Sequence, residues 1–162
     1  MDIIEVKVGI ADMKAVFSPN KLITVGLGSC VGIALFDKVN MIGGLVHIML
    51  PDSTQFLNVN NPIKFANLGI PNLIDEMGKM GAKKQNMKAK IAGGASMFNF
   101  PDKSVTMDIG NRNIISVKNT LTNLNIPIAA EDVGGNKGRT MIFDTQDGLV
   151  VIKTVGLGIK EL

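Results

Sequence analysis

Short apolar segments rich in β-branched residues, separated by clusters of glycine, run through most of this chain of 162 residues. Glycine permits the bends and close backbone approaches found where strands end, so the clusters mark strand boundaries. The pattern predicts nine strands, at residues 3–8, 15–17, 22–25, 31–36, 42–49, 87–92, 127–131, 140–143 and 150–155. This number of strands constrains the fold more than any other feature of the sequence.

Only two segments have the apolar spacing of a helix. The first follows Asn61 and Pro62, which suit an N-cap and a first helical position, and Pro71 within it predicts a kink or a fresh start. The second covers residues 112–124 and carries a clear apolar stripe that includes Val117 and Leu121. We therefore expect two helices.

Many strands with two helices predict an α+β fold, a layered sandwich of mixed β-sheets with helices packed outside. The regular strand and helix alternation of a doubly wound fold is missing. At about 100 to 200 residues per domain, we expect a single domain spanning residues 1–162.

Composition excludes several classes of protein. One Cys excludes an internal disulfide, and one Cys with one His argues against a structural zinc site, so we expect no metal. The 15 Lys and two Arg are spread along the chain and Trp and Tyr are absent, which argues against a nucleic-acid binder. We find neither an apolar run of about 18 to 20 residues nor a basic leader, and expect a cytoplasmic protein without membrane insertion.

The most informative segment runs from Thr24 to Gly32 and reads TVGLGSCVG. A strand enters a glycine-rich turn with the only thiol, Cys30, at its far end. Backbone N–H groups near Gly28 and Ser29 would stabilise the oxyanion formed when this thiolate attacks a carbonyl group. The alternative is that Cys30 is a small buried apolar residue. A phosphate-binding loop is disfavoured, because the dinucleotide pattern needs glycine at position 31, which is valine.

The only histidine, His47, lies on the strand that follows. If the hairpin turns between Lys38 and Val39, residue 30 faces residue 47, and Cys30 and His47 become cross-strand partners. A bulge at Gly43 and Gly44 would break this match. The imidazole would raise the thiolate fraction and later protonate a leaving group. Thr24 is a candidate to orient the ring, although it would also suit a plain strand position, and His47 would suit a core histidine.

These residues belong to a series of motifs that resembles the CheD family of chemoreceptor glutamine deamidases. The motifs occur in order along nearly the whole chain: TVGLGSCV at 24–31, GG at 43–44, HIMLPDS at 47–53, AKIAGGASMF at 89–98, IGNRN at 109–113 and AEDVGGN at 130–136.

The resemblance implies an enzyme that converts glutamines of methyl-accepting chemotaxis receptors to glutamates and also hydrolyses glutamyl methyl esters. It implies Cys30, His47 and Thr24 as catalytic residues, no cofactor, and a fold similar to bacterial toxin cysteine deamidases. It also implies a CheC-type phosphatase as a regulatory partner. A non-enzymatic adaptor that binds such a phosphatase is the alternative.

Two further residues are candidates for substrate binding. Phe98 would offer an apolar contact to a receptor helix, or pack on the core at a strand end. Arg112 would bind an acidic receptor surface, or form a structural salt bridge. The asparagine-rich stretch at 55–61 leaves the path after His47 open.

Overall fold

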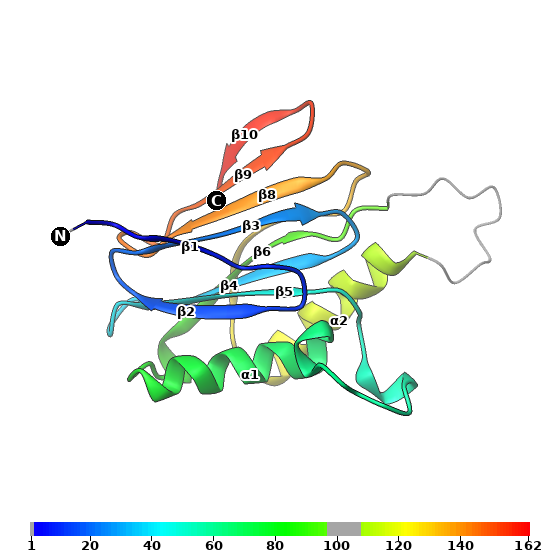
Figure 1. Cartoon of the computed structure of the whole chain (residues 1–162), viewed down its shortest axis with the longest axis horizontal. Coiled ribbons are helices and arrows are strands. Elements are labelled where there is room, and N and C mark those ends of the chain that lie inside the picture. The colour runs from blue at the N-terminus through cyan, green and yellow to red at the C-terminus, as the bar shows by residue number, and fades with distance from the viewer. Residues whose placement is uncertain (1, 97–107) are drawn as a thin grey trace.

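The computed structural model describes residues 2–96 and 108–162, and their strands form two five-stranded sheets (Figure 1). Sheet A contains, in spatial order, β1 (Glu5–Lys7), β3 (Lys21–Leu27), β8 (Arg139–Asp144), β9 (Val150–Thr154) and β10 (Gly158–Glu161). Sheet B contains β2 (Met13–Phe17), β5 (Ile42–Ile48), β4 (Val31–Asp37), β6 (Met87–Gly93) and β7 (Ile128–Val133).

Both sheets are mixed. β1 pairs with β3, and β6 with β7, in parallel, whereas the remaining neighbours are antiparallel. The expected α+β sandwich of mixed sheets is confirmed. The sequence pattern missed β10, because this strand has one apolar residue, Ile159, and all four of its residues are exposed.

The helices α1 (Ala66–Lys79) and α2 (Ile109–Asn123) pack on the outer face of sheet B (Figure 1). One apolar cluster fills this layer and includes Ile33, Val46, Leu73 and Val117. A second cluster lies between the sheets and includes Leu22, Leu27, Leu45 and Met141. All seven residues of β5 are buried, because helices cover one of its faces and sheet A covers the other.

The first helix differs from its sequence prediction. Asn61 caps a short 3-10 helix, Pro62–Lys64, by accepting the Ile63 N–H at 3.0 Å. The chain is extended at Phe65, and α1 then begins at Ala66 and continues through Pro71. The expected fresh start at Pro71 is therefore wrong, since the break in helical structure lies at Phe65. There are two more 3-10 turns in the described chain. Ser53–Gln55 comes before the 3-10 helix Pro62–Lys64, and Lys84–Asn86 comes directly before β6.

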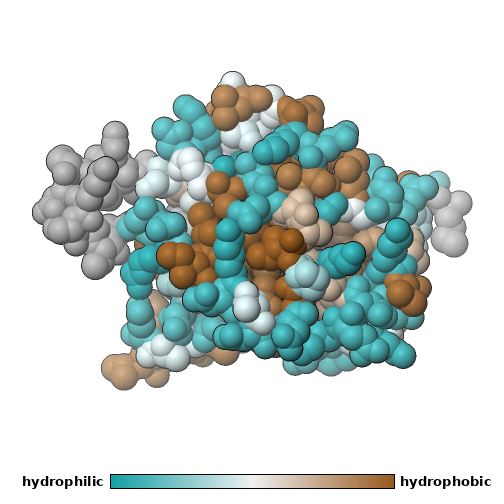
Figure 2. All heavy atoms as spheres, turned by 180° about the vertical axis from the view of Figure 1, so that it is seen from behind, coloured by the Kyte–Doolittle hydropathy of each residue, from teal (hydrophilic) through white to brown (hydrophobic). Residues whose placement is uncertain are grey.

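In the described part of the chain, no helix packs on the outer face of sheet A (Figure 1). Val25, Val155 and Ile159 are accordingly exposed. From behind, apolar residues reach the surface near the centre of the molecule among hydrophilic side chains (Figure 2). Neither α1 nor α2 has the length and apolar character of a helix that crosses a membrane.

Candidate functional site

A bulge in β3 shapes the end of the strand that carries Thr24. Thr24 pairs with Met141 and Leu27 pairs with Arg139, so two residues of β3 face one residue of β8. Gly26 within the bulge has φ of 72°, a left-handed conformation that glycine adopts without strain. The Thr24 side chain is buried, with 1% of its surface exposed, and faces the space between the sheets.

His47 reaches Thr24 across that space. Thr24 Oγ1 lies 2.7 Å from His47 Nδ1 and 2.7 Å from the Val8 carbonyl oxygen. A carbonyl only accepts, so the single hydroxyl proton goes to Val8, and the hydroxyl accepts from Nδ1–H. The neutral ring therefore carries its proton on Nδ1 and a lone pair on Nε2. Nε2 is buried and has no hydrogen-bond partner among the described residues.

The hairpin register differs from the prediction by two residues. His47 pairs with Gly32, and Ile42 with Asp37, so the turn is centred between Val39 and Asn40. The Asp37 carboxylate determines this turn by accepting the N–H groups of Val39 and Asn40, both at 3.0 Å. The predicted direct pairing of Cys30 with His47 is therefore wrong. Both glycines of β5 pair without a register shift, so the bulge that the sequence left open is absent from this hairpin.

Cys30 nevertheless belongs to the same side of sheet B as His47. It lies two residues before Gly32, the partner of His47, and alternate residues of a strand share a face. Its half-buried side chain packs against the apolar cluster between the sheets. A slip by two residues preserves the face, which is why the two side chains still share one side of the sheet.

Burial keeps both groups neutral. It raises the pKa of the Cys30 thiol above its ordinary value of 9.0, although the Cys30 N–H opposes this by bonding the sulfur. It lowers the pKa of His47 from 6.5 to about 4. The expected thiolate, stabilised by an imidazolium, is therefore not the resting state of the free protein at neutral pH, where a thiol lies near a neutral base.

The loop before Cys30 is held by its carbonyl groups. Gly28 C=O accepts the Ala95 N–H at 2.8 Å, and Cys30 C=O accepts the Gly94 N–H at 2.8 Å. Asn113 of α2 donates to the Ser29 carbonyl at 2.9 Å. The N–H groups of Ser29 and Cys30 donate to no other residue in the described part of the chain. Unpaired N–H groups beside a thiol are donors of the kind that an oxyanion hole requires.

Comparison with known proteins assigns this arrangement to a family. The profile of CheD, described as chemotactic sensory transduction, matches residues 49–154. Two relatives named probable chemoreceptor glutamine deamidase CheD, from Clostridium kluyveri and Clostridium botulinum strain Hall, are each 67% identical over all 162 residues, which is the full length of both chains. The chain belongs to the CheD family. The profile match begins after His47, whereas the full-length relatives also cover Thr24, Cys30 and His47.

Among solved structures, the Bacillus licheniformis hypothetical protein YfiH gives a TM-score of 0.47 at 17% identity. The match covers 77% of this CheD chain and 51% of the YfiH chain.

The stretch after His47 folds back beside it in this CheD protein. The Asn61 side chain donates to the Ala11 carbonyl at 3.1 Å, and the Ala11 N–H donates to the His47 carbonyl at 2.9 Å. Phe56 packs on Phe65, with ring centroids 5.2 Å apart. Residues 55–61 therefore extend from the end of β5 that carries His47.

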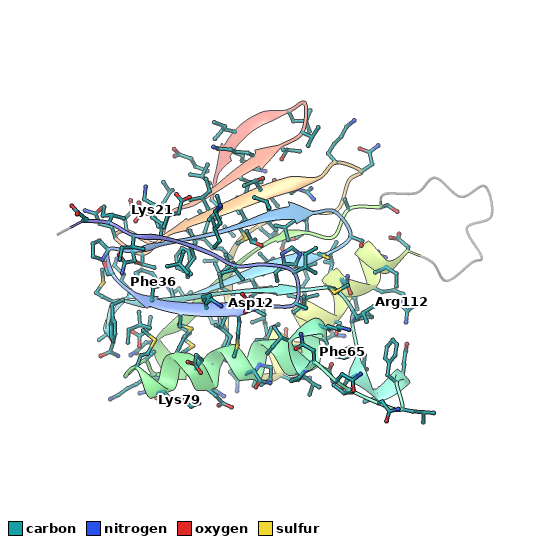
Figure 3. All side chains as sticks on the ribbon, in the orientation of Figure 1. Asp12, Lys21, Phe36, Phe65, Lys79 and Arg112 are labelled. Carbon is teal, nitrogen blue, oxygen red and sulfur yellow. The ribbon has the colours of Figure 1, made fainter. Side chains whose placement is uncertain are left out.

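The two candidate substrate-binding residues have different outcomes. Phe98 lies outside the described residues. Arg112 donates to the Gln55 side chain at 3.0 Å and lies on α2 at the same end of the molecule as Phe65 (Figure 3).

A pocket of about 220 Å³ between the sheets, lined by Phe36 and Phe143, lies at the other end of β4 from Cys30.

The sequence analysis quotes Asn113 within the IGNRN motif but gives it no role at the candidate site. Its side chain is fully buried and donates to the Ser29 and Met49 carbonyl groups, each at 2.9 Å. The signal was present in the sequence, because Asn113 lies four residues before Val117 and so falls on the apolar stripe of α2. A polar residue on a buried stripe needs a buried partner.

Proposed function

We propose that this protein deamidates particular glutamine side chains of methyl-accepting chemotaxis receptors. The proposal takes the activity from the names of the full-length relatives. It assigns Cys30 as the nucleophile, His47 as the base and acid, and Thr24 as the residue that orients His47. The observation that carries it is the relay from the Val8 carbonyl through Thr24 to His47, which leaves an unprotonated Nε2 on the face that Cys30 shares.

The proposed reaction begins with attack of Cys30 Sγ on the carboxamide carbon while the thiol proton passes to His47 Nε2. The carbonyl π electrons move to oxygen, and the N–H groups of Ser29 and Cys30 stabilise the resulting anion. When the intermediate collapses, His47 returns the proton to the amide nitrogen, the C–N bond breaks, and ammonia leaves. A thioester remains on Cys30.

Water completes the cycle. His47 Nε2 accepts a proton from water as its oxygen attacks the thioester carbon, and the C–S bond then breaks as the thiol regains the proton. Glutamate is the product. The same steps would release methanol from a glutamyl methyl ester, so we propose that activity for the same site. No step requires a metal or organic cofactor.

A single domain working in the cytoplasm suits this role, because the substrate would be a receptor's cytoplasmic part. We propose a CheC-type phosphatase as a regulator that competes with receptors for the surface around Cys30. Arg112 remains a proposed receptor contact, and its bond to Gln55 would have to rearrange. The adaptor alternative differs in needing no chemistry at Cys30.

The test is peptide mass spectrometry on a receptor cytoplasmic domain incubated with wild-type protein, Cys30→Ala or His47→Ala. Conversion of discrete glutamines by the wild type alone would support the deamidase. A wild type that leaves every glutamine unchanged while binding the phosphatase tightly would favour the adaptor role.

A further inference from the structure

Asn113 connects the two segments that carry the proposed catalytic pair. Its amide donates one hydrogen bond to the Ser29 carbonyl, just before Cys30, and one to the Met49 carbonyl, two residues after His47. Both partners are carbonyl oxygens, which only accept, so the NH2 group must face them. The side-chain oxygen, Oδ1, is buried without a partner among the described residues.

The unpaired Oδ1 shows what this position contributes. A buried acceptor without a hydrogen bond is destabilising, so the side-chain oxygen contributes nothing favourable at this position. The useful part of Asn113 is therefore its pair of donors.

The first of those donors determines how one peptide group is turned. The Ser29–Cys30 peptide is trans, because the only cis bond in the described residues is Ser18–Pro19. In a trans peptide the C=O and N–H groups point in opposite directions. Since the Ser29 carbonyl points at Asn113, the Cys30 N–H points away from α2.

The Cys30 side chain is attached to the Cα atom next to this N–H group, and the N–H group lowers the pKa of the thiol, so the sulfur lies close to it. An oxyanion on a carbon bonded to this sulfur would form within reach of the same N–H group. The orientation of a single peptide thus decides whether the nucleophile has a donor beside it or a repelling carbonyl.

We propose that Asn113 is a positioning residue that holds the Ser29–Cys30 peptide with its N–H group in the oxyanion hole. The inference rests on the proposed deamidase function. The neighbouring carbonyls of Gly28 and Cys30 are bound by Ala95 and Gly94, so within this loop the loss of Asn113 releases only the Ser29–Cys30 peptide. The thiol keeps its place while the oxyanion loses a donor.

Close packing around glycines makes this contact possible. A side chain at Gly93 would collide with the Cys30 carbonyl oxygen. A side chain at Gly110 would collide with the Ala95 carbonyl oxygen, just beyond the end of β6. These glycines let the loop, the end of β6 and the first turn of α2 meet. Asn113 lies one turn further along the helix and reaches the loop from there.

The test compares Asn113→Leu and Asn113→Ala with the wild type and a control. Leucine retains the branched shape without donors and removes the orphaned oxygen, so it keeps the test available should the alanine variant fail to fold. Asn72→Ala is the matched control, because Asn72 donates to the Leu68 carbonyl within α1, away from the loop. Two rates are measured: kcat and KM for receptor deamidation, and alkylation of Cys30 by iodoacetamide.

We expect kcat to fall about 10- to 1,000-fold in the Asn113 variants, the range seen when one oxyanion donor is lost, with KM within about twofold. Alkylation needs no oxyanion hole and should stay within about twofold of wild type. A kcat close to wild type in Asn113→Leu, or equal losses in both rates, would overturn the inference. Absence of Cys30-dependent deamidation in the wild type would instead count against the proposed function.

Discussion

His47 of sheet B and Thr24 of sheet A are joined by a 2.7 Å hydrogen bond between Nδ1 and Oγ1, so the two sheets meet at the candidate site. The Thr24 hydroxyl donates its own hydrogen bond to the Val8 carbonyl at 2.7 Å. This relay fixes the ring and its tautomer at once, because no other arrangement of protons satisfies all three groups. The packing of the two sheets thus leaves Nε2 with an unprotonated lone pair.

Removal of the Thr24 hydroxyl should slow catalysis without removing it. Thr24→Val keeps the β-branched shape but leaves Nδ1–H without an acceptor, so the ring loses its fixed orientation. We expect kcat for receptor deamidation to fall about 10- to 100-fold. Thr24→Ser retains the hydroxyl and should recover most of the rate. Equal rates for Thr24→Val and Thr24→Ser would show that the hydroxyl does not orient the ring.

Much of this site follows from the sequence, because the only thiol and the only imidazole flank one hairpin. The register did not follow, since it depends on hydrogen bonds from Val39 and Asn40 to the Asp37 carboxylate that spacing alone does not reveal. The shared face of Cys30 and His47 survived the error, because it changed the register by two residues.

The fold class followed from strand number, whereas two details depended on packing. β10 forms by pairing with β9 although its residues are exposed, so no apolar alternation marks it. Asn113 falls on the apolar stripe of α2, which indicates burial, but its hydrogen-bond partners appear only once α2 is placed against the loop before Cys30. Its role depends on carbonyl groups that are distant in the sequence, Ser29 and Met49.

The stability of the protein should depend on pH through His47. Its pKa is 6.5 ordinarily and about 4 in the folded protein, so between these values the unfolded chain binds more protons. The contribution of His47 to stability is therefore complete above pH 6.5, is lost as pH falls to about 4, and levels off below that, by about 3 kcal/mol in all. Urea unfolding at several pH values measures it. His47→Gln should remove this dependence between pH 4 and 6.5, and an unchanged slope in that variant would contradict the assignment.

The Cys30 thiol should react slowly at neutral pH in the free protein. Burial raises its pKa above 9.0, so the thiolate, which is the reactive form, accumulates only in alkaline solution. The alkylation rate with iodoacetamide should rise with pH to a midpoint above 9. Because Cys30 is the only cysteine, the urea-unfolded chain provides the control and should show a lower midpoint. A folded-state midpoint below pH 7 would instead indicate a thiolate and imidazolium pair.

Asp37 should stabilise the fold from the end of β4 away from Cys30. Its fully buried carboxylate accepts N–H groups of Val39 and Asn40, and the Lys83 N–H at 2.8 Å. Burial raises its pKa, but the hydrogen bonds outweigh this and the net pKa is lowered, so its contribution is lost only as pH falls below its ordinary value of 3.8.

Asp37→Ala would leave those N–H groups without their acceptor, and we expect a loss of about 3 kcal/mol in unfolding free energy, measured by urea denaturation at pH 7. Asp147→Ala is the matched control, since the Asp147 carboxylate is exposed and accepts the Leu149 N–H at 2.9 Å. It should change stability by less than about 1 kcal/mol.

The Asp37 turn lies seven residues along the chain from Cys30, at the other end of β4. We therefore expect the kcat of Asp37→Ala, measured well below its melting temperature, to match that of the wild type. A large loss of kcat in folded Asp37→Ala would mean that the hairpin register, and not stability alone, depends on this carboxylate.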